Sequence, residues 1–206
     1  MKRVRTAVLI SGRGSNMKAL LDAAKDPAYP AEIVLVAANV PGAGGLDIAR
    51  AAGIDTATID HRGKGGREAF ERELHARLLE ARTELVCLAG FMRLLTPFFV
   101  DAWAGKMLNI HPSLLPAFPG LDTHQRAIDA GAKFGGCTVH FVTSEMDVGP
   151  IVAQAAVPIL PGDDAPTLAA RVLVAEHKIY PAALAAVASG RPAPAGAVPT
   201  VYNPPL

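Results

Sequence analysis

Hydrophobic and polar positions fall into two kinds of segment over the first half of the chain. Short runs rich in apolar and β-branched residues alternate with longer stretches in which apolar residues have helical spacing. The runs that we expect to be strands are residues 4–10, 32–40, 55–60, 84–90 and 106–110. Most of these runs are apolar nearly throughout, as in a parallel sheet whose two faces are both covered by helices. The alternation therefore predicts an α/β fold with a mostly parallel central sheet.

Helices are expected between these strands. The segments with helical spacing are residues 16–25, 46–53, 67–81 and 95–105. In the third of them, apolar and long side chains recur three or four positions apart at Phe70, Leu74, Arg77 and Leu78. This spacing predicts one buried stripe, with the intervening charged residues, including Glu71, and also His75 on the solvent side.

The pattern changes after residue 111. Residues 111–124 contain three prolines and a glycine, which excludes a continuous helix or central strand and predicts a shaped surface loop. Residues 135–146 and 150–160 have strand character and are separated by the turn sequence MDVGP. This half need not be parallel, and we expect an antiparallel addition to the sheet.

The remaining sequence predicts one long helix and a tail. Residues 164–189 have helical spacing, with Asp163 or Asp164 as the N-cap. The last 16 positions, residues 191–206, are rich in proline and glycine. A chain of 206 residues is long enough for one substantial core. We therefore expect a single Rossmann-like domain over residues 1–190 and a Pro-rich C-terminal tail over residues 191–206.

Composition excludes several classes of protein. Half of the residues are apolar, 19% are charged and the formal net charge is +1, so nothing indicates a nucleic-acid partner. No apolar stretch approaches the roughly 20 residues that cross a membrane. Cys87 and Cys137 lie in apolar runs without metal-ligand spacing, which favours buried thiols in a reducing compartment and no metal site. A cytoplasmic protein is the expectation.

The first candidate for chemistry is the sequence SGRGSN at residues 11–16. Gly12 and Gly14 permit a tight turn after the first strand, and Ser15 and Asn16 stand where a helix begins with free N–H groups. Such a turn suits a phosphate, although it is neither a Walker A loop nor a dinucleotide fingerprint. The alternative is a plain strand-to-helix turn capped by Ser15 or Asn16.

Asn109, His111 and Asp147 are the second candidate. Asn109 and His111 end the fifth strand and, two residues apart on an extended chain, point to the same side. An amide donor beside an imidazole suits a reaction that develops negative charge on a carbonyl oxygen. Asp147, in the turn MDVGP, is able to orient His111 if that turn folds back toward it. Separately, these residues read as a loop histidine and a turn aspartate.

Four motifs in this order resemble one known family. They are SGRGSN, AGFMRLLTP, MLNIHPSLLPAFPGLDTHQRAI and GGCTVHFVTSEMDVGPIVAQ. The set resembles phosphoribosylglycinamide formyltransferases over about residues 4 to 190. The resemblance implies that the amine of glycinamide ribonucleotide attacks the formyl carbon of 10-formyltetrahydrofolate in purine synthesis. It also implies that Asn109 and His111 stabilise the oxyanion, and that Asp147 holds His111 and assists proton transfer to the leaving folate nitrogen.

Binding residues follow from the same resemblance. Those implied for glycinamide ribonucleotide are Gly14, Ser15, Asn16 and Glu176. Those implied for 10-formyltetrahydrofolate are Arg67, Met92, Arg93, Leu94, Leu95 and Asn109. Gly12 and His140 are implied to line the site. Asp122 stands where many relatives have histidine, which puts the contacts of its loop in doubt.

Other readings of the sequence remain open. Methionyl-tRNA formyltransferase shares the catalytic half but needs an RNA-binding domain, and formyltetrahydrofolate deformylase adds a regulatory domain ahead of the catalytic one. We expect neither additional domain here, because the first strand begins near residue 4 and the charge is close to neutral. A nucleotide-binding protein without catalysis is a third reading. The expected partners are the two small substrates, with no nucleic acid, no membrane and a monomeric or homodimeric state.

Overall fold

The computed structural model describes residues 2–63 and 65–190 of the chain. The predicted tail, residues 191–206, lies outside this part. The chain forms two compact units, one ending at Asn109 and the other beginning at Ile110. The single domain over residues 1–190 stays a prediction.

Five parallel strands form the sheet of the first unit. They are β1 (Val4–Ile10), β2 (Ala31–Ala38), β3 (Thr56–Thr58), β4 (Leu85–Leu88) and β5 (Met107–His111), of which the last continues two residues past the boundary at Asn109. Their order is β3-β2-β1-β4-β5, and all the pairs are parallel. The order of strands along the chain reverses between β1 and β4. Ligands of open α/β sheets bind at the carboxyl ends of the strands beside such a reversal.

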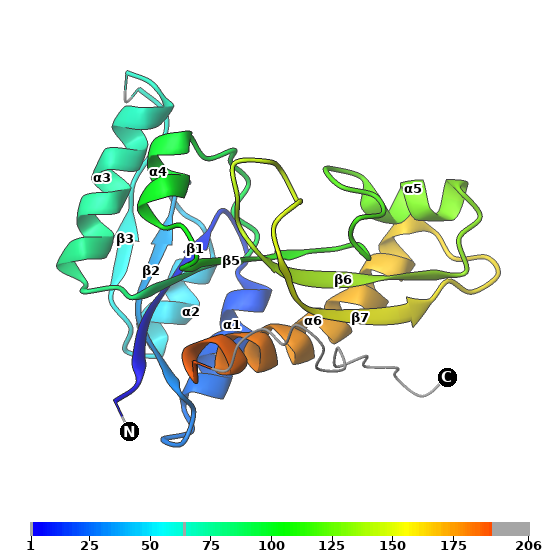
Figure 1. Ribbon diagram of the computed structural model, residues 1–206, viewed down its shortest axis with the longest axis horizontal. Coiled ribbons are helices and arrows are strands. Elements are labelled where there is room, and N and C mark those ends of the chain that lie inside the picture. Colours follow the sequence, from blue (N-terminus) through cyan, green and yellow to red (C-terminus); the bar gives the residue numbers. More distant parts are fainter. Residues whose placement is uncertain (1, 64, 191–206) are drawn as a thin grey trace. The chain divides into compact units, whose positions relative to one another are not determined.

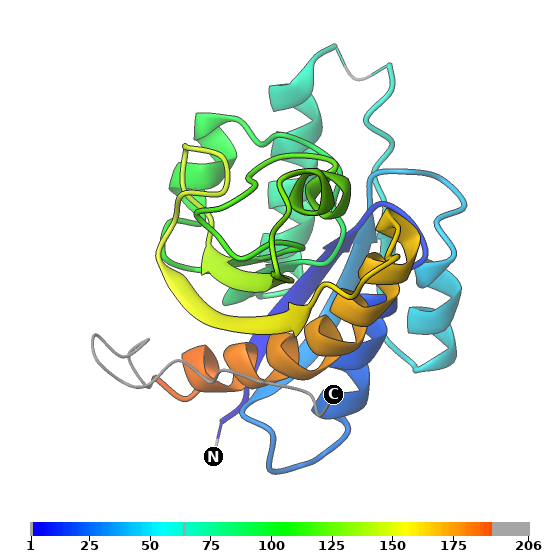
Figure 2. The same ribbon diagram turned by 90° about the vertical axis from the view of Figure 1, so that its right-hand side faces the viewer.

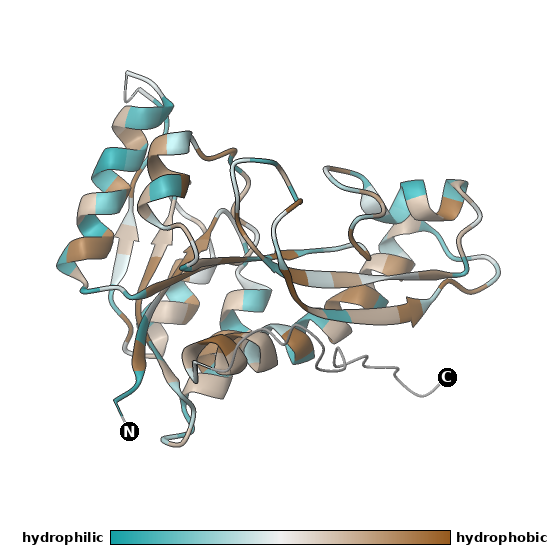
Figure 3. Ribbon diagram, in the orientation of Figure 1, coloured by the Kyte–Doolittle hydropathy of each residue, from teal (hydrophilic) through white to brown (hydrophobic). Residues whose placement is uncertain are grey.

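Two pairs of helices cover these strands. They are α1 (Ser15–Ala24) with α2 (Gly45–Ala51), and α3 (Arg67–Glu80) with α4 (Pro97–Ala102). Figures 1 and 2 show α1 and α2 on one face of the parallel strands and α3 and α4 on the other. Because both faces are covered, the strands are apolar over most of their length, and much of that length is brown in Figure 3. Residues 7–10 of β1, for example, are fully buried.

One face of α3 differs from its prediction. Phe70, Leu74 and Leu78 are buried as expected. Glu71, expected on the solvent side, is only 1% exposed, and half-buried His75 packs edge-on against the rings of Phe98 and Trp103. The prediction was wrong at both positions because α4 packs against α3 and covers a second stripe of that helix. Periodicity within one helix does not show a neighbour of this kind.

The second unit is built on an antiparallel strand pair, as the sequence predicts. Strands β6 (Phe134–Phe141) and β7 (Ile151–Pro158) pair in antiparallel register, and helix α6 (Ala165–Ala188) packs on both of them. Asp164 is the N-cap of α6, and its carboxylate accepts a hydrogen bond from the Thr167 N–H at 2.9 Å. The α/β class, mostly parallel with an antiparallel C-terminal addition, is confirmed.

One helix was not predicted. Helix α5 (Thr123–Asp129) follows the proline-containing loop and has only seven residues. It begins after Asp122, which occupies the N-cap position with the left-handed φ of 56°. Within the described residues, none of the helices is both long and apolar enough to span a bilayer.

Candidate active site

The loop between β1 and α1 turns at Gly14. This residue has the left-handed φ of 74° and is the N-cap of α1. The Gly14 backbone lies so close to α2 that a Cβ added at Gly14 would stand 3.0 Å from the Gly45 Cα. The alternative that Ser15 or Asn16 caps the helix is wrong, because Ser15 is already the first helical residue and the N-cap makes no side-chain hydrogen bond.

This turn leaves the positive end of α1 without a capping side chain. Gly12 is exposed, and its carbonyl is held from the α2 side by the Gly45 N–H at 3.0 Å. Ser15 is half-buried and Asn16 is buried at the start of the helix. A helix start of this form presents N–H groups and the helix dipole to an anion such as a phosphate.

The segment between β4 and α4 carries the residues that we expect to contact a folate. Met92 is 73% exposed and Leu94 is 60% exposed, whereas Arg93 and Leu95 are half-buried. The Met92 N–H donates a hydrogen bond of 2.8 Å to the Ser11 hydroxyl, so this segment adjoins the loop after β1. Arg67 is exposed at the first position of α3. Exposed apolar side chains on a segment without helix or strand fit the flat, partly polar ring of a pteridine.

Strand β5 carries Asn109 and His111. The two residues alternate with buried Ile110, so their side chains leave the strand on the same side. His111 is 6% exposed, and Asn109 is half-buried. The predicted amide and imidazole are thus held by a strand rather than by a mobile loop, which gives them fixed directions.

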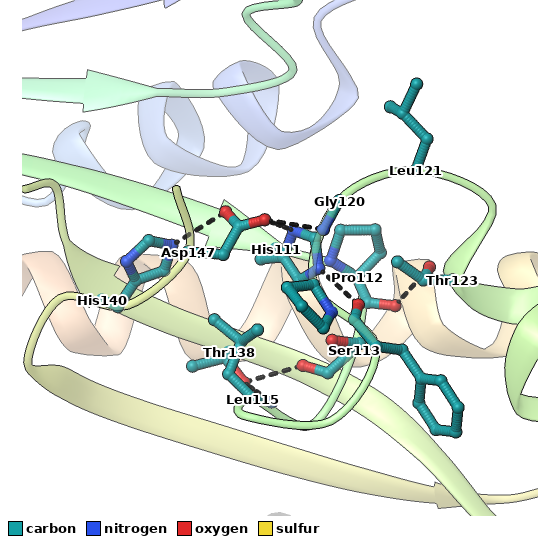
Figure 4. Close-up of polar contacts among 12 residues, drawn as sticks. His111, Pro112, Ser113, Leu115, Gly120, Leu121, Thr123, Thr138, His140 and Asp147 are labelled. Atoms are coloured by element: carbon teal, nitrogen blue, oxygen red, sulfur yellow. Dashed lines mark hydrogen bonds and ion pairs between the residues drawn. The ribbon is translucent and has the colours of Figure 1, made fainter. Parts of the chain in front are cut away.

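Both ring nitrogens of His111 face hydrogen-bond acceptors. Its Nε2 lies 3.1 Å from the Phe118 carbonyl oxygen, and its Nδ1 lies 3.4 Å from Asp147 Oδ2. A carbonyl only accepts, so Nε2–H is the donor in the first contact. The predicted approach of Asp147 to His111 is therefore present (Figure 4). Both side chains are close to nine-tenths buried or more, which strengthens their electrostatic interaction.

Asp147 is held in place from its backbone and from its carboxylate. It has the left-handed φ of 59°, which Asp and Asn adopt more readily than other residues with a side chain. Its Oδ2 accepts a hydrogen bond of 2.9 Å from the Gly120 N–H, and its Oδ1 lies 3.8 Å from His140 Nε2. Asp147 consequently stands between two imidazoles (Figure 4).

His140 lies on the other side of Asp147 from His111. Burial lowers the pKa of His140, and this effect exceeds the opposing effects of the Phe141 carbonyl and the Asp147 carboxylate. Its Nδ1 lies 3.0 Å from the Phe141 carbonyl, so Nδ1 carries the hydrogen. His140 is therefore a neutral ring at neutral pH that lines the Asp147 carboxylate.

Sequence reasoning missed the residues that anchor the loop after His111. The Thr138 hydroxyl donates to the Ser113 carbonyl at 2.7 Å and accepts from the Leu115 N–H at 3.0 Å. Gln154 donates to the Leu115 carbonyl at 2.8 Å. Figure 4 shows the Thr138 contact with Ser113 beneath the loop. The sequence signal for these contacts is the polar Thr138 inside the apolar run GGCTVHF, because a buried hydroxyl in a strand needs a hydrogen-bond partner.

Two residues of the second unit that the sequence analysis named, Glu176 and Cys137, are buried. Glu176 is 7% exposed on α6. Burial raises the pKa of the Cys137 thiol, with the Glu176 charge adding to the effect. Cys137 and, in the first unit, Cys87 are both buried and neither forms a disulfide, so the prediction of buried thiols is confirmed. Among residues 2–63 and 65–190 there is no group of three or more metal-ligating side chains.

The turn that carries Asp147 depends on a glycine. A Cβ at buried Gly149 would stand 1.7 Å from the Phe141 carbonyl oxygen. We expect Gly149→Ala to lower the free energy of unfolding by about 2 kcal/mol or more, because the turn must move away from β6. Thermal melting measures this change. The control is Gly44→Ala, where no atom lies within 4 Å of the added Cβ and φ is −59°. Equal melting temperatures of the two variants would contradict the predicted clash.

The sequence matches the formyl transferase family over residues 4–184. The phosphoribosylglycinamide formyltransferase of Escherichia coli strain K12 is 47% identical, with 89% of this chain and 87% of that protein covered. The trifunctional purine biosynthetic protein adenosine-3 of Bos taurus is 52% identical over 92% of this chain. The chain spans only 19% of the length of that trifunctional protein.

Solved structures give the same relationship. The phosphoribosylglycinamide formyltransferase from Brucella melitensis has a TM-score of 0.87 and 54% identity, and the match covers 96% of this chain and 98% of that one. The glycinamide ribonucleotide transformylase 1 from Symbiobacterium toebii has a TM-score of 0.89 and 46% identity, with 92% of this chain and 89% of that one covered. Together with the buried histidine–aspartate pair at the end of β5, these matches show that the chain belongs to the formyl transferase family.

Proposed function

We propose that the protein transfers the formyl group of 10-formyltetrahydrofolate to the amine of glycinamide ribonucleotide, in de novo purine synthesis. The observation that carries this proposal is the contact between His111 and Asp147, with Asn109 on the same strand. The names of the relatives support the choice of acceptor. No observation favours a different acceptor or hydrolysis by water.

The donor supplies an activated formyl group, and the chain supplies hydrogen bonds and a route for one proton. As the amine nitrogen bonds to the formyl carbon, negative charge develops on the formyl oxygen. In our proposal, Asn109 and His111 stabilise that oxygen with hydrogen bonds, and His111 does so by turning its Nε2–H from the Phe118 carbonyl to the formyl oxygen while its Nδ1 stays beside Asp147. The carbon–nitrogen bond to the folate then breaks, and the proton lost by the amine ends on the folate nitrogen. Asp147 assists this transfer, directly or through water, while holding His111.

The binding residues are assigned by the same proposal. The helix start formed by Gly14, Ser15 and Asn16 binds the phosphate of glycinamide ribonucleotide, and Glu176 contacts its glycinamide end. The folate contacts are assigned to Arg67, Met92, Arg93, Leu94, Leu95 and Asn109. The exposure of Met92 and Leu94 supports the folate assignment, because it leaves apolar surface within reach of a flat ring on this segment. Gly12 and His140 complete the lining. Cytoplasmic location, and a monomer or homodimer acting on small molecules alone, belong to the proposal.

One assay tests the reaction. Purified protein is mixed with 10-formyltetrahydrofolate and glycinamide ribonucleotide, and the folate product is followed by absorbance. We expect product only when both substrates are present, and we expect formylglycinamide ribonucleotide in equal amount by mass spectrometry. Folate product that forms without glycinamide ribonucleotide would indicate hydrolysis instead. Absence of any product, with folate binding intact, would contradict the acceptor.

A further inference from the structure

The segment from Phe91 to Thr96 has no helix or strand to hold its course. It lies between β4 and α4, and its exposed fractions alternate, with Met92 and Leu94 turned to solvent. A segment without regular hydrogen bonding needs other contacts to keep one conformation. The contacts that it makes come from α3 and from the loop after β1.

The C-terminal end of the segment is held by a buried carboxylate. Glu71 is 1% exposed and accepts hydrogen bonds from both the N–H of Thr96, at 2.9 Å, and the Thr96 hydroxyl. Thr96 is the N-cap of α4, yet its side chain makes no capping bond to that helix. Threonine at an N-cap ordinarily bonds to its own helix. Here the hydroxyl is directed to α3 instead, which ties the end of the segment to that helix.

The N-terminal end is held by a relay of polar side chains. The Met92 N–H donates to Ser11 Oγ at 2.8 Å, and the Ser11 hydroxyl donates in turn to Asn39 Oδ1 at 2.6 Å. Asn39 is 2% exposed at the end of β2, and its Nδ2 lies 3.3 Å from His61 Nδ1. Three loops at the carboxyl edge of the sheet therefore fix the position of one main-chain N–H.

The side chains between the two ends divide into two sets. Phe91 stacks on Phe70 of α3 with ring centroids 6.5 Å apart, and the Arg93 guanidinium lies 5.5 Å from the centroid of the same ring. These residues face α3, so Met92 and Leu94 are left on the open side. Helix α3 thus determines which residues of the segment a ligand can reach.

We propose that Glu71 is a positioning residue for folate binding, acting through Thr96, with Ser11 in the same role at the other end. The proposal rests on the proposed function, in which residues 92–95 contact the folate. Glu71 lies beneath the segment and touches no substrate in this scheme. Its loss should therefore weaken the binding of the donor, while the acceptor and the rate of the chemical step are little affected.

The test uses four single variants of the full chain and one double variant, Glu71→Gln with Thr96→Val. Glu71→Gln keeps the shape but replaces one acceptor by a donor, and Thr96→Val removes the hydroxyl donor without removing a helix cap. Thr96→Ser keeps the hydroxyl. The matched control is Glu68→Gln on the same helix, where the carboxylate is exposed and pairs with Arg72. For each protein, kcat and both KM values are measured, together with a direct binding titration of a folate analogue and a thermal melt.

We expect Glu71→Gln and Thr96→Val each to raise the KM for 10-formyltetrahydrofolate and the Kd of the analogue by about tenfold, the size expected when a hydrogen bond to a buried charged group is lost. The KM for glycinamide ribonucleotide and kcat should stay within about twofold, as should all values of Glu68→Gln and Thr96→Ser. The double variant of Glu71→Gln and Thr96→Val should be little worse than either single one, because both remove the same contact.

Several outcomes would overturn the positioning role. A folate KM within twofold of wild type in both Glu71→Gln and Thr96→Val is one, and an equal rise of both KM values is another. A double variant with fully multiplied effects would show that Glu71 does not act through Thr96. If Glu71→Gln fails to fold, Thr96→Val and Thr96→Ser carry the same comparison. The analogue titration does not depend on turnover. If the wild-type protein transfers no formyl group, the proposed function is refuted, but the analogue Kd values of the variants still test the positioning role.

Discussion

Replacing His111 with alanine is expected to lower kcat by about three orders of magnitude while the protein remains folded. The ring is 6% exposed and is fixed between the Phe118 carbonyl and the Asp147 carboxylate. Both of these partners are acceptors, so the ring is held as a hydrogen-bond donor beside the place where a negative oxygen forms in the proposed reaction. Alanine removes the donor, and water in the vacated space would not be fixed in direction.

Steady-state kinetics and a thermal melt of the same preparation measure this effect. The KM values should change much less than kcat, because the lost interaction belongs to the transition state. His75→Ala serves as the control, since His75 packs between aromatic rings of the first unit and has no role in the proposed chemistry. Turnover near the wild-type rate in folded His111→Ala would exclude His111 from the reaction.

Changing Asp147 to asparagine is expected to lower kcat by about two orders of magnitude. Asparagine tolerates the φ of 59° and keeps an oxygen that can accept from the Gly120 N–H, so the turn should remain as it is. What is lost is the negative charge 3.4 Å from His111 and the carboxylate that assists proton transfer in the proposed reaction. Asp147→Asn therefore tests the loss of the negative charge while the structure of the turn is kept.

A second substitution at this position supplies the control. Asp147→Ala removes the acceptor for the Gly120 N–H as well, so we expect a lower melting temperature than for Asp147→Asn but a similar loss of kcat. The double variant of His111→Ala and Asp147→Asn should be about as slow as His111→Ala alone, since the two residues act as a unit. Multiplied losses in the double variant would indicate independent roles.

Much of the fold could be predicted because it depends on local patterns. The predicted bounds of β1, residues 4–10, agree with the structure, and α6 begins after one of the two proposed caps. The strand expected over residues 135–146 ends earlier, at Phe141, because the polar residues that follow belong to the turn. Helix α5 was missed because it is short and follows a left-handed residue at Asp122.

The chemistry of the candidate site could be predicted from the sequence, but the residues that hold its loops in place could not. A histidine, an amide and an aspartate in suggestive places are visible in the sequence, and the approach of Asp147 to His111 was a hypothesis that the structure bears out. The partners Thr138, for the loop, and Glu71, for the folate segment, were not foreseen. Thr138 acts 25 residues away from Ser113, and the Glu71 contact spans another 25 residues to Thr96. Contacts at such separations depend on strand register and helix packing, which a single sequence does not specify.

Asp147 must meet two demands at once, and this restricts the residues that the position tolerates. Its backbone conformation disfavours nearly every amino acid with a side chain other than Asp and Asn. Its contacts with His111 and with one main-chain N–H require a short carboxylate. Glycine and asparagine satisfy the first demand, and glutamate satisfies only the charge. Of the twenty amino acids, aspartate alone meets both demands, so a random library at this codon should return aspartate as the one residue with wild-type kcat.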